Sequence, residues 1–236
     1  MVTDSVKVRL PNDISHNIDI KAASEAIAVV GNRVVVEMLP VDKPTTLLLP
    51  DNLINFWRGC VGVVIQSPNF VVKAKGKLIE PPMVGDLVIV HPQDGVHIDN
   101  AEMGKYKTSN QIRVYGAYAE YVGEPIACDW WESIMASIDT NMNLRAYGNK
   151  SIFKKDKAVG VSDNGIFLPD GHHQRNEMAI IVSRGPLADP DAKVGDRVSY
   201  NPHYIERDGV DLGTGVSNFD YFIASDLAIN YVVTED

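Results

Sequence analysis

Short, β-branched apolar runs separated by turn-forming residues are the dominant pattern of this sequence. Clear examples are residues 34–36, 61–65, 87–90, 178–182 and 221–223. Runs of this length, closed by Gly, Pro, Asn or Asp, are typical of strands in a small barrel or a sandwich. Residues 112–122 partly alternate between apolar and polar or small side chains, which predicts one half-buried strand. The pattern therefore predicts an all-β fold.

Helical signals are few and short. Asp129 is followed three residues later by Glu132, so the two could form a capping box at the start of residues 130–138. One or two further helical turns could lie within residues 16–27. We therefore expect helix only as a minor component of the fold.

The chain repeats one pattern twice. Residues 31–51 (GNRVVVEMLPVDKPTTLLLPD) and 148–170 (GNKSIFKKDKAVGVSDNGIFLPD) share Gly-Asn, a basic residue, an apolar run, a polar loop, an apolar tripeptide and Pro-Asp. Val84-Gly85-Asp86 recurs as Val194-Gly195-Asp196. The order is the same, but the offsets are 117, 119 and 110 residues. Unequal offsets indicate a duplicated unit with loop insertions and not a short-period repeat.

The repeat divides the 236 residues into three parts. Residues 1–24 have no counterpart in the second copy and form an N-terminal extension. Residues 25–140 form the first unit and residues 141–236 the second, each long enough to bury a core of its own. Residues 139–147 are the expected crossover between the units.

Charge and composition narrow the classes of function. The net charge of −9 argues against binding to nucleic acid or to an anionic membrane, because both require a positive surface field. Lys154, Lys155 and Lys157 form the longest basic run, which we expect on a solvated loop. Cys60 and Cys128 have no metal-ligand spacing, so they are expected as buried free thiols, with a disulfide as the alternative. Neither a signal peptide nor a membrane helix is recognisable, so we expect a cytoplasmic protein.

Motifs of enzymes and cofactor sites are absent from the sequence. There is no phosphate-binding G-x-x-x-x-G-K-[ST], no H-E-x-x-H, no paired C-x-x-C and no G-x-S-x-G. His172 and His173 are adjacent and point to opposite faces of an extended segment, which is unsuited to chelation. His91, His97 and His203 follow predicted strands and could meet in space. Trp130-Trp131 is expected in a core or an interface. From the absence of these motifs, the sequence predicts no enzyme, no cofactor and no metal.

Five motifs in order resemble those of the GroES-type co-chaperonins. Residues 164–170 (NGIFLPD) and 193–198 (KVGDRV) are similar to that family's Gly-Gly-Ile-(Val/Ile)-Leu-Pro-Asp and Lys-Val-Gly-Asp-Arg-Val segments. Arg184-Gly185-Pro186 resembles its Val-Gly-Pro-Gly turn, Asn201-Pro202-His203-Tyr204 stands where the family has a tyrosine-containing loop, and residues 219–233 (FDYFIASDLAINYVV) resemble its closing segment. The first unit matches through residues 47–51 (LLLPD) and through 67–85, which resemble the family's roof hairpin, with an insertion at 95–130. The resemblance implies two tandem GroES-like small β-barrels, as in a divergent and possibly viral member of the family.

The same resemblance implies a function. In the family, a flexible loop after the first strand carries an apolar tripeptide that docks in a groove of a GroEL-type chaperonin. Carried over to this sequence, the partner-binding residues are Leu47, Leu48, Leu49, Ile166, Phe167 and Leu168. The alternative is that these six residues belong to strands in a core.

We therefore expect a co-chaperonin lid that assembles into a homo-oligomeric ring or array and caps an ATP-driven chaperonin. It would bind neither nucleic acid nor membrane. The alternative function is a structural or assembly protein of a virus particle, which would reuse the fold to contact neighbouring shell subunits. In a viral setting the protein would lie in the host cytoplasm or in the virion.

Overall fold

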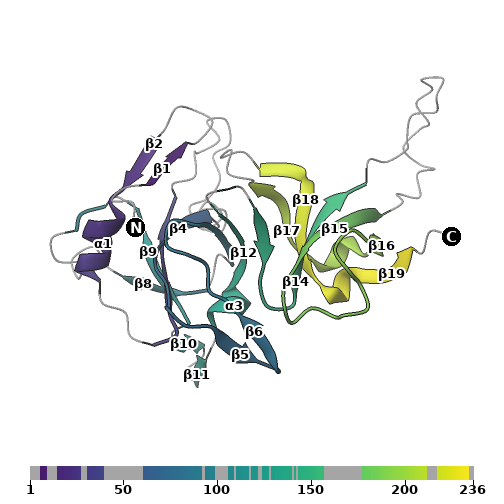
Figure 1. Cartoon of the computed structure of the whole chain (residues 1–236), viewed down its shortest axis with the longest axis horizontal. Helices are drawn as coiled ribbons and strands as arrows, with labels where there is room; N and C mark the ends of the chain where they lie inside the picture. Colours follow the sequence, from purple (N-terminus) through teal and green to yellow (C-terminus); the bar gives the residue numbers. More distant parts are fainter. Residues whose placement is uncertain are drawn as a thin grey trace.

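The computed structural model describes most of the chain as short antiparallel strands (Figure 1). The described residues are 6–9, 15–27, 31–39, 61–91, 94–98, 106–108, 110–116, 118–121, 124–127, 129–139, 141, 143–156, 177–211 and 217–233. Strands dominate these ranges, and the helices are short. The all-β prediction is therefore confirmed.

A seven-stranded antiparallel sheet is formed by strands that lie between residues 34 and 146. Its strands in chain order are β3 (Val34–Met38), β4 (Val61–Gln66), β7 (Leu87–Val90), β8 (Val96–Ile98), β9 (Ile112–Tyr115), β12 (Ile134–Ile138) and β13 (Leu144–Ala146). Their order across the sheet is β13-β12-β7-β4-β3-β9-β8. β3 lies between β4 and β9, and all five of its residues are buried because apolar clusters cover both faces.

A six-stranded antiparallel sheet contains the strands of the second half. They are β14 (Lys150–Lys155), β15 (Met178–Arg184), β16 (Arg197–Tyr200), β17 (Ile205–Asp211), β18 (Ser217–Ser225) and β19 (Ile229–Val233). Their order across the sheet is β17-β18-β14-β15-β16-β19. Its core includes the stacked rings of Phe153 and Phe222, whose centroids are 4.8 Å apart.

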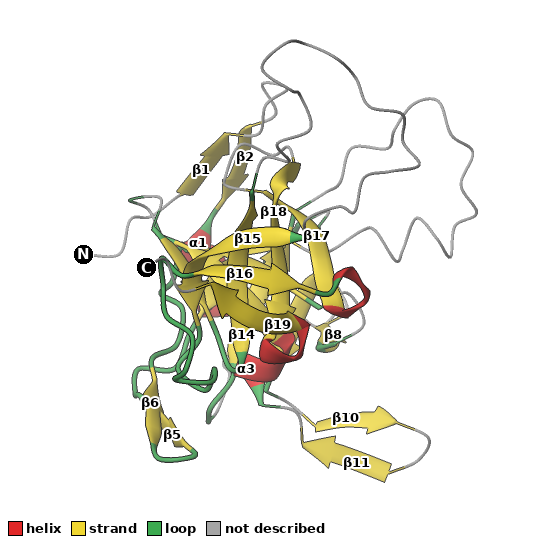
Figure 2. Ribbon diagram, turned by 90° about the vertical axis from the view of Figure 1, so that its right-hand side faces the viewer, coloured by secondary structure: helices red, strands yellow, loops and turns green. Residues whose placement is uncertain are grey.

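Three two-stranded hairpins and several short helices complete the described part of the chain. The hairpin strands are β1 (Val6–Arg9), β2 (Ser15–Ile18), β5 (Val72–Ala74), β6 (Lys77–Ile79), β10 (Tyr118–Tyr121) and β11 (Glu124–Ala127). The helices are α1 (Ile20–Ala26), α3 (Trp130–Ser133) and the 3-10 turns η2 (Pro202–Tyr204) and η3 (Asp226–Ala228). Figure 2 shows β5–β6 and β10–β11 projecting from the sheets.

The helix expected within residues 16–27 is present as α1. The carboxylate of Asp19 caps it by accepting a hydrogen bond from the backbone N–H of Ala22 at 2.9 Å. Ile20 and Ala23 of α1 are buried in a cluster with Val35 of β3. The Ser24 hydroxyl also donates to the carbonyl of Ile65 at the end of β4. This part of the N-terminal extension therefore belongs to the core of the first unit.

The two large sheets repeat one strand order. Read from the same edge, β12-β7-β4-β3-β9-β8 of the first sheet corresponds to β19-β16-β15-β14-β18-β17 of the second. The register also agrees. Val36 pairs with Val64 in the first sheet and Phe153 pairs with Ile181 in the second, and both residues of the second pair lie 117 positions after those of the first. A bulge precedes this position in both β3 and β14. The structure thus agrees with the duplication predicted from the sequence.

Neither large sheet closes on itself over the described residues. The first ends at β13 and β8, and the second at β17 and β19. The coarse prediction of antiparallel β units therefore holds, whereas the closed small barrels implied by the resemblance are not shown.

Three local predictions were wrong. Residues 112–122 form two strands, β9 and β10, because Gly116 adopts φ +83° and a Cβ there would lie 2.5 Å from the carbonyl oxygen of Asn32. Residues 139–147 are not a simple crossover, since β13 within them pairs with β12. Lys154 and Lys155 lie on strand β14 and not on a solvated loop.

Trp130 and Trp131 were expected either in a core or in an interface, and in the structure both are core residues. The Trp130 side chain is fully buried, and its indole N–H donates to the side-chain oxygen of Asn32 at 2.9 Å. The ring packs edge-on against Trp131 and Tyr147. Of the segment 130–138 expected to begin a helix, only α3 (Trp130–Ser133) is helical and Ile134–Ile138 form strand β12; the Asp129 side chain makes no capping hydrogen bond.

Candidate functional site

The predicted partner-binding residues fall on equivalent connections of the two units. Leu47, Leu48 and Leu49 lie between β3 and β4, and Ile166, Phe167 and Leu168 lie between β14 and β15. All six are outside the described residues. The structure does describe the strands from which both connections leave and to which they return.

Both connections begin and end at equivalent atoms. The backbone N–H of Leu39 donates to the carbonyl of Val61 at 2.9 Å, and that of Asp156 donates to the carbonyl of Met178 at 2.9 Å. Leu39 and Asp156 are 117 residues apart, and so are Val61 and Met178. The two connections therefore have the same length and are closed by the same hydrogen bond.

Ion pairs hold the base of the second connection. Lys155 contacts the carboxylate of Asp208 at 2.6 Å, and Arg197 contacts that of Asp156 at 2.7 Å. These pairs tie the end of β14 to β17 and β16. Because all four side chains are at least partly exposed, each pair contributes little to stability, about 0–1 kcal/mol.

A tight turn is repeated with atomic correspondence in the two units. The N–H of Gly85 donates to the carbonyl of Val64 at 2.9 Å, and the N–H of Gly195 donates to the carbonyl of Ile181 at 2.8 Å. The carboxylates of Asp86 and Asp196 accept from the backbone N–H three residues earlier, each at 2.8 Å. Burial raises the pKa of Asp86, against the effect of this hydrogen bond.

We expect Gly195→Ala to destabilise the protein without any clash. Gly195 has φ +97°, and a Cβ there would meet nothing within 4 Å. The cost is that of a left-handed backbone in an L-residue, about 1–2 kcal/mol. Chemical denaturation measures it, with Ala188→Gly on the same connection as a control at a position of ordinary φ. An unchanged midpoint for Gly195→Ala would contradict the assigned turn.

The two units meet at a short, largely apolar junction. The backbone N–H of Ala146 in β13 of the first sheet donates to the hydroxyl of Ser183 in β15 of the second sheet at 3.0 Å. One buried cluster combines residues of the first sheet with residues of the second. Its members are Ile89, Met135, Ala136, Ala146, Ile152, Val210 and Ile223. The units therefore share a core. β13 is followed by Tyr147, and Gly148 and Asn149 then connect it to β14.

A histidine and a carboxylate lie close to this junction. Nδ1 of His91 is 3.6 Å from an oxygen of Asp94. The nearby carboxylate of Asp94 raises the pKa of His91 above its usual value of 6.5, with a smaller contribution from Glu206, whereas burial and Lys150 oppose it. The same interaction with His91 lowers the pKa of Asp94. The Lys150–Glu206 ion pair at 2.7 Å belongs to the second unit, so this charge cluster spans both units.

We expect the stability of the protein to fall between pH 6 and pH 8. Because the folded-state pKa of His91 is raised, its contribution is complete below the unfolded pKa and is lost as pH rises through the folded pKa. His91→Gln should reduce this pH dependence, whereas His97→Gln, at an exposed position on β8, should leave it intact. Urea denaturation at both pH values measures the difference. Equal pH dependence in the wild type and His91→Gln would contradict the assignment.

One edge of the second sheet is open where the corresponding edge of the first is covered. β12 pairs with β7 on one side and with β13 on the other, whereas its counterpart β19 pairs only with β16 within the described residues. Leu227 and Tyr231 beside this edge are 73% and 59% exposed. An open strand edge with exposed apolar side chains is suited to pairing with another chain.

The described residues contain no cluster suited to metal binding. No three His, Cys, Asp or Glu side chains among them converge on one point, and this includes His91, His97 and His203. His172, His173, Cys60 and Cys128 are outside the described residues. Within the described part of the chain, no helix combines the length and hydropathy needed to cross a bilayer.

Two features of the structure were not predicted from the sequence. Glu37 is a buried carboxylate that accepts hydrogen bonds from Tyr106, Thr108 and Asn110 at 2.6, 2.6 and 2.9 Å. Each oxygen of the Glu37 carboxylate therefore has at least one hydrogen-bond donor. The second feature is the exposed β5–β6 hairpin, whose Lys-x-Lys-x-Lys pattern (residues 73–77) marks a local basic site in an acidic chain.

Comparison with known proteins gives no assignment. No family model matches this sequence, and no curated protein matches it either.

Proposed function

We propose that the protein is a tandem co-chaperonin lid with two GroES-like units, which caps an ATP-driven GroEL-type chaperonin. The observation that carries the proposal is the pair of equivalent connections, closed by the same hydrogen bond at Leu39–Val61 and Asp156–Met178. Each connection contains one of the apolar tripeptides singled out by the resemblance. Each copy thus offers two docking segments in equivalent positions.

Multivalency gives such a lid its affinity. A docking loop that becomes ordered on binding loses conformational entropy, so one loop binds weakly and reversibly. Several loops on one assembly recover affinity through their effective concentration. A small change in the partner ring is then enough for release, and the lid itself needs no catalytic group, cofactor or metal.

The junction within the chain is a template for assembly between copies. β13, the strand that leads into the second unit, covers the edge of β12 in the first. β19 is the counterpart of β12. If the same contact forms between copies, the open edge of β19 would pair with the segment that leads into the first unit of another copy. Head-to-tail contacts of this kind generate a ring if the rotation closes and an open array if it does not.

The alternative function is a structural or assembly protein of a virus particle. The open β19 edge favours it to the same degree, because the edge would pair equally well with a neighbouring shell subunit. The two functions differ in the partner of the apolar tripeptides. A lid requires them to dock on a chaperonin, and a shell protein requires them in contacts between subunits.

Phe167→Asp is expected to abolish chaperonin binding while leaving the fold intact. An apolar anchor in a docking groove typically contributes about 2 kcal/mol or more, and a charge in its place adds a desolvation cost. Biolayer interferometry against an immobilised GroEL-type chaperonin with ATP measures the loss. Val194→Asp, at an exposed apolar position on the repeated turn, is the matched control and should bind as the wild type does. Unchanged binding by Phe167→Asp would remove this residue from the docking segment.

A further inference from the structure

The starting observation is a contact between the two units of one chain. Leu187 follows β15 of the second unit and packs against the buried cluster of the first. Val72 and Ala74 of the β5–β6 hairpin pack against the same cluster. The backbone N–H of Leu187 is held by the carbonyl of Gly148 at 2.9 Å. The segment after β15 therefore rests on the preceding unit, beside the elements that support its hairpin.

The counterpart of Leu187 in the first unit is Phe70. β4 and β15 match with an offset of 117 residues, because Gln66 faces Val35 as Ser183 faces Ile152. Phe70 lies 117 residues before Leu187 and is 48% exposed, with Val71 beside it also exposed. If the repeat holds between copies, Phe70 contacts the second unit of another copy.

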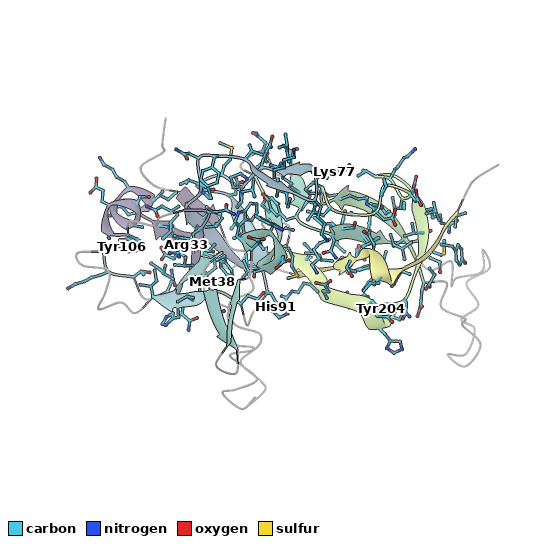
Figure 3. All side chains as sticks on the ribbon, turned by 90° about the horizontal axis from the view of Figure 1, so that it is seen from below. Arg33, Met38, Lys77, His91, Tyr106 and Tyr204 are labelled. Atoms are coloured by element: carbon cyan, nitrogen blue, oxygen red, sulfur yellow. The ribbon has the colours of Figure 1, made fainter. Side chains whose placement is uncertain are left out.

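The β5–β6 hairpin that follows Phe70 is basic and carries no ion pair. Lys73, Lys75 and Lys77 are all exposed, and none of them pairs with a carboxylate in the described part of the chain. Lys75 adopts φ +47°, a conformation uncommon for a lysine. In Figure 3, Lys77 lies on the side of the molecule opposite His91, so these charges are separate from the cluster at the junction.

The corresponding connection of the second unit has the opposite charge. The segment between β15 and β16 contains Asp189, Asp191 and Asp196 against the single lysine Lys193. Asp189 and Asp191 are exposed. The backbone N–H of Asp189 donates to the Asp226 carboxylate at 2.6 Å, which also binds Arg184, so the segment is anchored. The two copies of the unit have therefore diverged to opposite charge at the same structural position.

We propose that the basic β5–β6 hairpin docks on the acidic β15–β16 connection of a second copy of this chain. The repeat brings Phe70 of one copy to the second unit of the next, where this connection lies, and the charges there are complementary. Basic and acidic connections then alternate along the assembly, whereas two identical units would place like charges together. This inference rests on the head-to-tail assembly described under the proposed function.

The chemistry of the hairpin favours a protein partner over a bilayer. A segment that inserts into lipid presents its apolar residues at the tip, whereas here the tip is Lys75-Gly76 and the exposed Leu78 lies behind it. The net charge of −9 makes any second copy an acidic partner. Charge complementarity across such an interface guides encounter and register.

The test is the self-association of the full chain, followed by sedimentation velocity over a range of concentrations. K73E/K75E/K77E should weaken association at least tenfold, and adding D189K/D191K to the same chain should restore it. K21E/K107E/K154E makes the same charge change at exposed positions elsewhere and is expected to associate as the wild type does. High salt should weaken association of the wild type, because exposed pairs are screened.

Several outcomes would overturn the inference. The first is a wild type that is still monomeric at 100 μM, about a hundred times the concentration at which a complex with a dissociation constant of 1 μM would form. The second is equal association of K73E/K75E/K77E and the control. The third is that D189K/D191K fails to restore association. A chaperonin-capping assay separates this result from the proposed function. Capping by a hairpin variant that still assembles normally would contradict the inference alone, whereas salt-sensitive assembly without capping would contradict the lid function alone.

Discussion

Trp130→Ala is expected to lower the free energy of unfolding by about 3–5 kcal/mol, the range for truncating a fully buried large aromatic residue. The Trp130 ring is fully buried and contacts Trp131 and Tyr147 edge-on. Tyr147 belongs to the junction between the units, and burial raises its pKa to about 12. The substitution therefore opens a cavity at the point where the first core meets the second unit.

Trp130→Phe separates packing from hydrogen bonding. Phenylalanine retains most of the buried ring but leaves the Asn32 amide oxygen without its indole donor, at a cost of about 1–3 kcal/mol. Chemical denaturation followed by circular dichroism measures both variants. A loss below 1 kcal/mol for Trp130→Ala would contradict the placement of this side chain, since an ordinary surface substitution changes stability by only about 0.5 kcal/mol.

Gly185→Ala is expected to disrupt the junction between the units, with a loss of about 1–3 kcal/mol or more. A Cβ at this position would lie 2.3 Å from the carbonyl oxygen of Gly148 and 2.7 Å from the carbonyl carbon of Tyr147. Both are backbone atoms, so no side-chain rotation relieves the clash. The hydrogen bonds of Gly185 to Lys150 and of Leu187 to Gly148 would have to lengthen.

The distinguishing readout for Gly185→Ala is cooperativity. Because the two units share a buried cluster, we expect the wild type to unfold in one transition and the variant in two. Gly195→Ala serves as the control, since it changes stability through backbone conformation on one unit alone. Differential scanning calorimetry resolves the transitions. A single transition in Gly185→Ala at the wild-type temperature would contradict the close approach at the junction.

The sequence was sufficient for the strands and the repeat. Apolar runs such as 34–36 and 178–182 are flanked by turn residues, and each forms a strand in the middle of its sheet. The repeated Val-Gly-Asp motif was recognisable, and in the structure it forms a turn with Gly85 and Gly195 at positive φ. Such patterns depend only on residues close together in the sequence, so the sequence alone reveals them.

Contacts between distant residues could not be predicted in the same way. Glu37 is an acidic residue in a buried strand, and its partners come from residues 69 to 73 positions later. The break between β9 and β10 depends on the carbonyl of Asn32, far from Gly116 in the sequence. The basic hairpin was not predicted, because the net charge of −9 sums over the whole chain and does not show a local group of lysines. The six tripeptide residues stay a prediction that the described residues do not test.

The most direct test of the central proposal is electron microscopy of the purified protein mixed with a GroEL-type chaperonin and ATP. The account predicts chaperonin particles capped at one or both ends, and bare particles when Phe167→Asp replaces the wild type. Ordered oligomers of this protein beside uncapped chaperonin would contradict the lid function and favour a structural role in a larger particle.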